Sequence, residues 1–222
     1  MKTKATTTET DLKSKIKAAY QDYVLTEGKN PASVYGFAKS NGFSEDEFYQ
    51  HFQSFDSIVR DIWESLISNT LTRIENGDEY LQFSVREKIL TFYYTLVEEL
   101  RKQRSYVTFT TEGWIIPGKV QAPRKAIEKV LEPYFEKLIS EGYERNELFN
   151  RNKVSDFYKK ALGLQFWFIL DFWVKDSSKD FEDTDAVIEK AVNLGFDLMR
   201  ENTLDKAFDF AKFLFGRAKE AM

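Results

Sequence analysis

The segment from Ile16 to Ile62 constrains the fold more than any other part of this chain. Its apolar residues recur at the spacing typical of helices that bury one face. Gly28 is placed to end a first helix, Pro31 to open a second one, and Asn41-Gly42 to form the turn before a third. We therefore predict a longer helix followed by two short helices that a glycine-containing turn connects. That order of elements describes a helix-turn-helix.

The third helix of this motif carries the strongest local signals. Ser44 is a preferred capping residue, and Glu47 in the third position after it completes a capping box. Phe48 and Phe52 fall one helical turn apart and predict a buried face. A fourth helix follows Ser54, with this predicted apolar stripe: Phe55, Ile58, Val59, Ile62, Trp63 and Leu66.

Helical periodicity continues to the end of the chain. Further helices are predicted over 85–104, 124–141, 154–174, 183–200 and 203–219, with Pro133 expected to kink the second of these. The helix over 154–174 is apolar on nearly all sides, which predicts a central position. We expect an all-α protein with a disordered basic and polar tail (1–10), a three-helix helix-turn-helix domain (11–56) and a larger helical domain (57–222).

Composition narrows the function classes. The 222 residues include no Cys and one His, which argues against thiolate nucleophiles, Cys-based zinc sites and a His-dependent triad. With no phosphate-cradling glycine loop either, we predict no enzymatic activity, no cofactor and no metal. No apolar run reaches the length of a membrane span, and a reducing cytoplasm fits the absence of Cys.

The helix-turn-helix segment resembles the DNA-binding domain of the TetR/AcrR family of repressors. The matching residues are Ile16, Ala19, Gly28, Ser33-Val34, Phe37-Ala38, Gly42-Phe43-Ser44, Phe48-Tyr49, Phe52 and Ile58. The resemblance implies a homodimer that pairs through its C-terminal helices, binds a pseudo-palindromic operator and responds to a hydrophobic small molecule. Candidate DNA contacts are Ser33, Lys39, Ser44, Asp46, Tyr49, Gln50 and His51, with the N-terminal lysines on phosphates. Candidate ligand contacts in the larger domain are Phe92, Tyr93, Trp114, Trp167, Phe168 and Trp173.

The charged residues of the motif differ from those that members of that family often carry. Phe55 stands where family members often carry Lys, and residues 31–63 hold two basic side chains against five acidic ones. Carboxylates repel phosphate, whose neutralisation supplies most non-specific affinity for DNA. Acidic residues at a helix start also stabilise the helix through its dipole. The acidic start is therefore either a structural device or the mark of a domain that has lost DNA binding.

A second resemblance concerns residues 176–199, which are similar to the C-terminal region of the coenzyme Q biosynthesis lipid-binding proteins. These share the TetR fold, and the resemblance implies an isoprenoid-lipid pocket and a terminal helix that touches membranes. The helix over 203–219 has a large apolar face with Lys and Arg among its polar positions, which suits either a membrane surface or packing within the protein. A TetR-fold lipid-binding protein without DNA function is thus the alternative reading. For Asp176 to Asp183 we predict a loop that caps the next helix.

Overall fold

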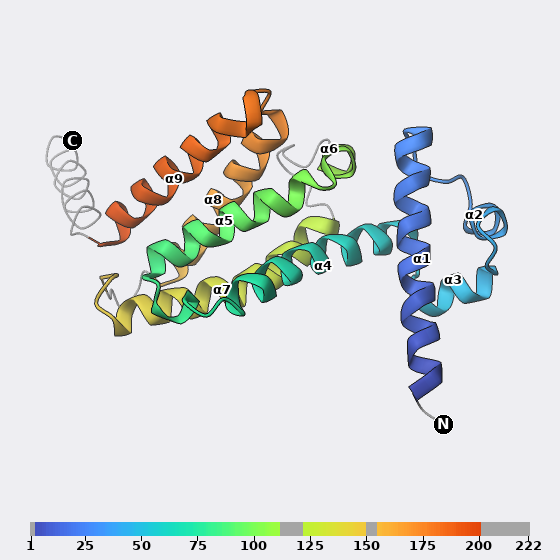
Figure 1. The fold of residues 1–222 in the computed structure, drawn as a ribbon, viewed down its shortest axis with the longest axis horizontal. Helices are drawn as coiled ribbons and strands as arrows, with labels where there is room; N and C mark the ends of the chain where they lie inside the picture. The colour runs from blue at the N-terminus through green and yellow to red at the C-terminus, as the bar shows by residue number, and fades with distance from the viewer. Residues whose placement is uncertain (1–2, 112–121, 150–154, 201–222) are drawn as a thin grey trace, which may run out of the picture. The chain divides into compact units, whose positions relative to one another are not determined.

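This computed structural model describes residues 3–111, 122–149 and 155–200. Within these ranges the chain forms α-helices and two 3₁₀-helices and no strand, which confirms the predicted all-α class. In chain order the elements are α1 (Thr3–Glu27), α2 (Val34–Ser40), α3 (Glu45–His51), α4 (Phe55–Glu75), η1 (Tyr80–Gln82), α5 (Val85–Arg101), α6 (Arg104–Thr111), α7 (Ala122–Glu144), α8 (Ser155–Lys175), η2 (Lys179–Phe181) and α9 (Glu182–Arg200) (Figure 1). The helix predicted over 203–219 lies outside the described residues.

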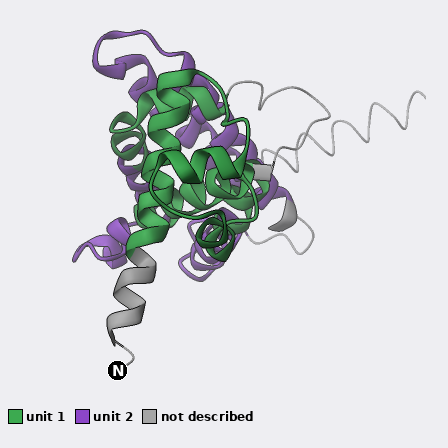
Figure 2. Cartoon of the chain, turned by 90° about the vertical axis from the view of Figure 1, so that its right-hand side faces the viewer, with its two compact units in different colours: residues 1–71, 96–130 green, residues 72–95, 131–222 purple. Residues whose placement is uncertain are grey.

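The chain divides into two compact units (Figure 2). Unit 1 comprises residues 1–71 and 96–130, and unit 2 comprises residues 72–95 and 131–222. The division does not follow the boundary predicted between residues 56 and 57. Helix α4 begins at Phe55, after the non-helical residues 52–54, and the division between the units falls inside this helix, after residue 71.

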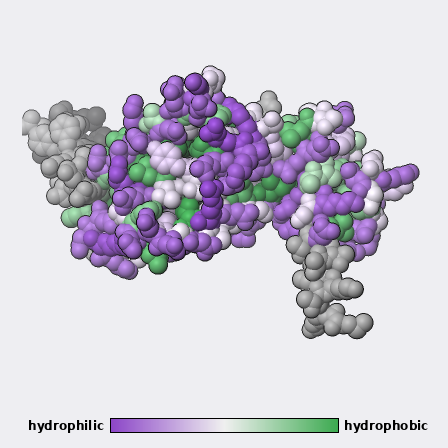
Figure 3. Space-filling view, viewed as in Figure 1, coloured by the Kyte–Doolittle hydropathy of each residue, from purple (hydrophilic) through white to green (hydrophobic). Residues whose placement is uncertain are grey.

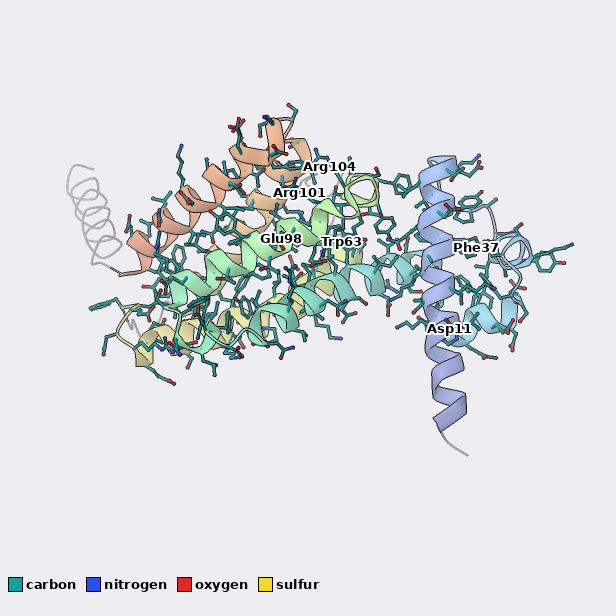
Figure 4. All side chains as sticks on the ribbon, viewed as in Figure 1. Asp11, Phe37, Trp63, Glu98, Arg101 and Arg104 are labelled. Atoms are coloured by element: carbon teal, nitrogen blue, oxygen red, sulfur yellow. The ribbon has the colours of Figure 1, made fainter. Side chains whose placement is uncertain are left out.

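Unit 1 is built around the aromatic ring of Phe37. Phe37 lies between α1 and α2 (Figure 4) and meets the rings of Phe43, Phe48 and Phe55 edge-on at centroid distances of 5.6, 6.3 and 5.4 Å. Tyr20 of α1 stacks on Phe55 at 5.7 Å. Edge-to-face pairs gain energy beyond their buried area, so this cluster fixes α1, α2, α3 and the start of α4 against one another.

Two predicted helix starts differ from the observed ones. Helix α1 begins at Thr3 rather than Asp11, so residues 3–10 are helical instead of a disordered tail. No Gly or Pro separates these residues from the rest of α1, so nothing in the sequence stops the helix there. Helix α2 begins at Val34 rather than near Pro31. Ser33 has extended backbone angles and accepts a hydrogen bond from the Gly36 N–H at 3.1 Å, so the serine cap sets the start.

Unit 2 has an aromatic core with one buried ion pair. The ring of Phe92 in α5 contacts Tyr134 and Phe135 of α7 and Phe166 of α8. Lys88 is buried and donates a hydrogen bond to Glu141 at 2.5 Å. Removal of the Glu141 carboxylate would leave the Lys88 charge buried and uncompensated, whereas Glu141 also pairs with Arg145 at 2.7 Å. Pro133 lies inside α7 and does not end it.

Helices α8 and α9 pack against each other within unit 2. Their contact is close, since a Cβ on Gly195 of α9 would lie 3.0 Å from the Gln165 side-chain nitrogen of α8. That nitrogen donates to the Ala191 carbonyl at 2.7 Å. The prediction of a central α8 is wrong, because Leu164 and Phe168 are 69% and 55% exposed. One apolar face of α8 is therefore left open in the single chain.

The segment between α8 and α9 forms the cap predicted for it. Asp176 is buried and accepts hydrogen bonds from the Ser178 and Thr184 N–H groups at 2.7 and 3.0 Å, and from the Thr184 hydroxyl at 2.5 Å. Although burial raises the pKa of Asp176, these donors hold it at about 2. In the ranges that the structure describes, no helix has both the length and the apolar character needed to cross a bilayer.

Candidate nucleic-acid interface

The local sequence around α3 folds as a self-contained capping unit. The Ser44 hydroxyl accepts from the Glu47 N–H at 3.1 Å, and the Glu47 carboxylate accepts from the Ser44 N–H at 2.7 Å. This confirms the predicted capping box. Both Ser44 hydrogen bonds lower the pKa of Glu47 and keep its carboxylate charged. The Glu47 carboxylate is therefore engaged in capping α3. Gly42 has a left-handed backbone conformation (φ 71°) and forms the turn that precedes α3.

The two phenylalanines of α3 anchor it in unit 1. Phe48 is fully buried, with its ring 5.7 Å from that of Phe55 and 6.2 Å from that of Phe52, which is also buried. Tyr49 is 51% exposed and Gln50 is exposed. His51 is half-buried, so of these three neighbouring candidate DNA contacts, Tyr49 and Gln50 are the more exposed.

Helix α2 adds an exposed aromatic and a cation to this surface. The Lys39 amine lies 5.9 Å from the centroid of the Tyr35 ring, and Tyr35 is 60% exposed. Tyr35 is not among the DNA contacts predicted from the sequence. The signal was available, because Phe37 and Ala38 mark the inner face of α2 and leave positions 35 and 39 outside. Ser33 is exposed but uses its hydroxyl oxygen as the cap of α2.

An ordered polar pair lies on the exposed side of α3. Gln50 donates a hydrogen bond from its side-chain amide to the Asp46 carboxylate at 2.8 Å, one helical turn away. Both residues are exposed, and so is Glu45 beside them. Figure 3 shows a largely hydrophilic surface on the face that it displays. The α3 surface therefore offers hydrogen-bonding groups rather than an apolar patch.

The basic residues of α1 are less free than the sequence suggested. Lys13 and Lys17 both pair with Asp61 of α4, the second at 3.0 Å. Although burial raises the pKa of Asp61, the hydrogen bonds from the two lysines hold it below its ordinary value. The Lys15 amine lies 6.0 Å from the Phe43 ring centroid. Of the lysines expected to reach phosphates, Lys13 and Lys17 are thus already paired within the protein.

A groove of about 430 Å³ opens in unit 1 at the end of α3. The groove is lined by His51, Phe52, Gln53, Ser57, Arg60, Asp61, Glu64, Lys125, Ala126 and Lys129. Among the described residues, no group of three or more His, Cys, Asp and Glu side chains is placed to hold a metal ion. The lining mixes cations, carboxylates and apolar atoms, and it contains none of the six predicted ligand contacts.

The structure separates those six ligand candidates. Phe92 and Tyr93 are fully buried and contact each other at a ring distance of 5.2 Å. Trp173 is buried and stacks on Phe181, whereas Phe168 faces solvent. Trp167 contacts Phe166 at 4.9 Å and is half-buried. Trp114 lies outside the described residues. Of the five candidates that the structure describes, Phe92 and Trp167 each contact Phe166, and Tyr93 contacts Phe92.

Fold and site together define a class of protein: an all-helical chain that presents a capped, phenylalanine-anchored helix-turn-helix. Residues 88–214 match the model of the tetracyclin repressor-like C-terminal domain family. The chain belongs to this TetR-like family. No curated protein matches the chain at the level of sequence. The resemblance of residues 176–199 to the coenzyme Q proteins stays a prediction.

Solved structures share the fold at low sequence identity. A protein of unknown function from Rhodococcus sp. RHA1 has a TM-score of 0.58 and 13% identity, covering 86% of this chain and 96% of its own. A putative TetR family transcription regulator from Shewanella sp. PV-4 has 0.57 and 13%, covering 85% and 97%. The fatty acid degradation regulator FadR from Bacillus halodurans has 0.56 and 16%, covering 83% and 94%. In each case the structural match covers nearly the whole length of the other protein.

Proposed function

We propose that this protein is a dimeric, DNA-binding transcriptional regulator, and a repressor, whose operator binding responds to a hydrophobic small molecule. The observation that carries the proposal is the arrangement of α3. Phe48 and Phe52 are buried under the helix, while Asp46, Tyr49 and Gln50 are exposed on it. A recognition helix needs one buried face that holds it in place and one exposed face that can reach base edges.

The open apolar face of α8 and α9 supports dimer formation. Leu164 and Phe168 of α8 fall one helical turn apart, and so do Leu194 and Leu198 of α9, all of them exposed in the single chain. Contiguous exposed apolar side chains mark interaction surfaces in soluble proteins. A second copy that covers this face with its own α8 and α9 forms an isologous four-helix interface. Two α3 helices in such a pair meet two half-sites of a pseudo-palindrome.

A hydrophobic ligand is supported by the aromatic content of unit 2. Phe92 and Trp167 contact Phe166, Tyr93 contacts Phe92, and these rings would suit an apolar molecule if unit 2 rearranges to admit it. The Bacillus halodurans relative regulates fatty acid degradation, so a long-chain fatty acid is the first probe to try. The ligand acts by preferring one of two conformations, only one of which fits the operator.

The test is selection from genomic DNA fragments by the full chain at low and at moderate salt. A repressor enriches a pseudo-palindrome, and its affinity falls as salt rises because counterions are released from the phosphates. Failure to enrich any fragment, with lipid found in the purified protein by mass spectrometry, would favour the lipid-binding alternative.

A further inference from the structure

Asp46 is an unusual residue to find on a surface that meets DNA, and its hydrogen bond to Gln50 gives it a role. Glu47 is occupied by the capping box, so Glu45 and Asp46 are the carboxylates that α3 leaves on its exposed side. Asp46 accepts from the Gln50 amide at 2.8 Å. Among the described residues, Glu45 makes no comparable hydrogen bond or ion pair.

That hydrogen bond fixes which atoms the pair presents. A glutamine amide has two N–H donors and one carbonyl oxygen. One N–H is taken by the Asp46 carboxylate, which would repel the carbonyl oxygen and so sets the orientation of the amide. The Gln50 carbonyl oxygen and the second Asp46 oxygen are then two acceptors on the outer side of α3, beside the remaining Gln50 N–H donor.

Two adjacent acceptors select among bases by their major-groove edges. Adenine and cytosine each present an exocyclic amine there, whereas guanine and thymine present carbonyl oxygens. Resting on the proposed function, we propose that Asp46 and Gln50 together read an exocyclic amine, adenine N6 or cytosine N4, at one position of each half-site. The Asp46 charge repels guanine O6 and thymine O4 at that position.

An acidic residue in this position is compatible with DNA binding. A carboxylate near the duplex weakens attraction to every phosphate to a similar extent, whatever the sequence. A hydrogen bond to an amine recovers that loss only at the matching base. Asp46 therefore lowers background affinity and raises discrimination, whereas Glu45, in the same helical turn, lowers background affinity alone.

This difference supplies a matched control. Asp46→Ala and Glu45→Ala each remove one exposed carboxylate from the first turn of α3, so their effects on helix dipole and phosphate repulsion are similar. Binding of the full-length protein to a randomised half-site library gives the base preference at each position. We expect the preference for adenine or cytosine at one position to fall about tenfold in Asp46→Ala and in Gln50→Ala, and to persist in Glu45→Ala.

Asp46→Asn gives a sharper outcome. Its side-chain oxygen still accepts from Gln50, but the outward atom changes from an acceptor to an N–H donor. We expect the preference at the same position to move toward guanine or thymine. Thermal unfolding of each variant, compared with wild type, separates a change in reading from a loss of folding.

Base analogues test whether the exocyclic amine is the group that Asp46 and Gln50 bind. In the selected site, purine replaces adenine or 2-pyrimidinone replaces cytosine, and each substitution removes the exocyclic amine. Wild-type affinity should fall about tenfold and Asp46→Ala affinity should not change. Equal losses in both proteins, or a Glu45→Ala variant that loses the same preference, would overturn the inference while leaving DNA binding intact. If wild type selects no motif, the proposed function itself fails.

Discussion

Replacing Phe48 by Ala tests whether the inner side of α3 anchors the whole motif. Phe48 is fully buried, and its ring meets those of Phe37, Tyr49, Phe52 and Phe55 at centroid distances of 6.3, 5.5, 6.2 and 5.7 Å. Truncating a fully buried Phe to Ala costs about 3–5 kcal/mol, because transfer free energy is lost and a cavity remains. Domains are stable by only about 5–15 kcal/mol, so unit 1 should come close to unfolding.

Hydrogen exchange of the α2 and α3 amides is the appropriate assay, because it reports local opening separately from unit 2. Phe48→Ala should abolish the protection of these amides and operator binding together. Tyr49→Ala is the adjacent control: Tyr49 is half-exposed, so DNA affinity should fall while protection stays near wild type. Protection in Phe48→Ala within about 1 kcal/mol of wild type would refute the anchoring role, since surface substitutions have effects below that size.

Four further predictions concern other contacts. Asp176→Ala should destabilise unit 2 by about 1–3 kcal/mol through loss of hydrogen bonds to a charged group, measured by urea unfolding. The folded pKa of Asp176, about 2, lies below its ordinary 3.8, so this carboxylate stabilises the fold above about pH 4, and that contribution should disappear as the pH falls to 2. Phe168→Asp should convert the proposed dimer to monomer in sedimentation and weaken operator binding, and a variant that sediments as the wild type does would show that α8 is not at the interface. Asp61→Asn should release Lys13 and Lys17, raising affinity for random DNA and steepening its salt dependence, provided that the unfolding curve is unchanged.

Local features of α3 were predictable because they depend on neighbouring residues. The capping box of Ser44 and Glu47 and the buried pair Phe48 and Phe52 follow from spacings within a single turn or two. The predicted start of α2 was wrong, and the reason is also local. Pro31 and Ser33 are both residues that favour the start of a helix. The helix begins after Ser33, because the Ser33 side chain accepts a hydrogen bond from a backbone N–H.

Long-range pairings could not be inferred. Lys13 and Asp61 are 48 positions apart, so their contact depends on how α1 meets α4. The exposure of Phe168 likewise depends on which face of α8 packs inside unit 2, and an all-round apolar helix gives no sign of this. The candidate DNA contacts keep the status of predictions, although the structure places Lys39, Asp46, Tyr49 and Gln50 in solvent.

The acidic turn at the start of α3 also has a consequence for how such a regulator would search a genome. A chromosome offers roughly a million or more competitor sequences, and a protein that adheres to them is depleted before it finds its target. Under the proposed function, Glu45 and Asp46, both in the first turn of α3, would shorten each stay on the wrong sequence. Fewer copies per cell would then suffice to keep a promoter occupied, and release from it would require a smaller change in affinity.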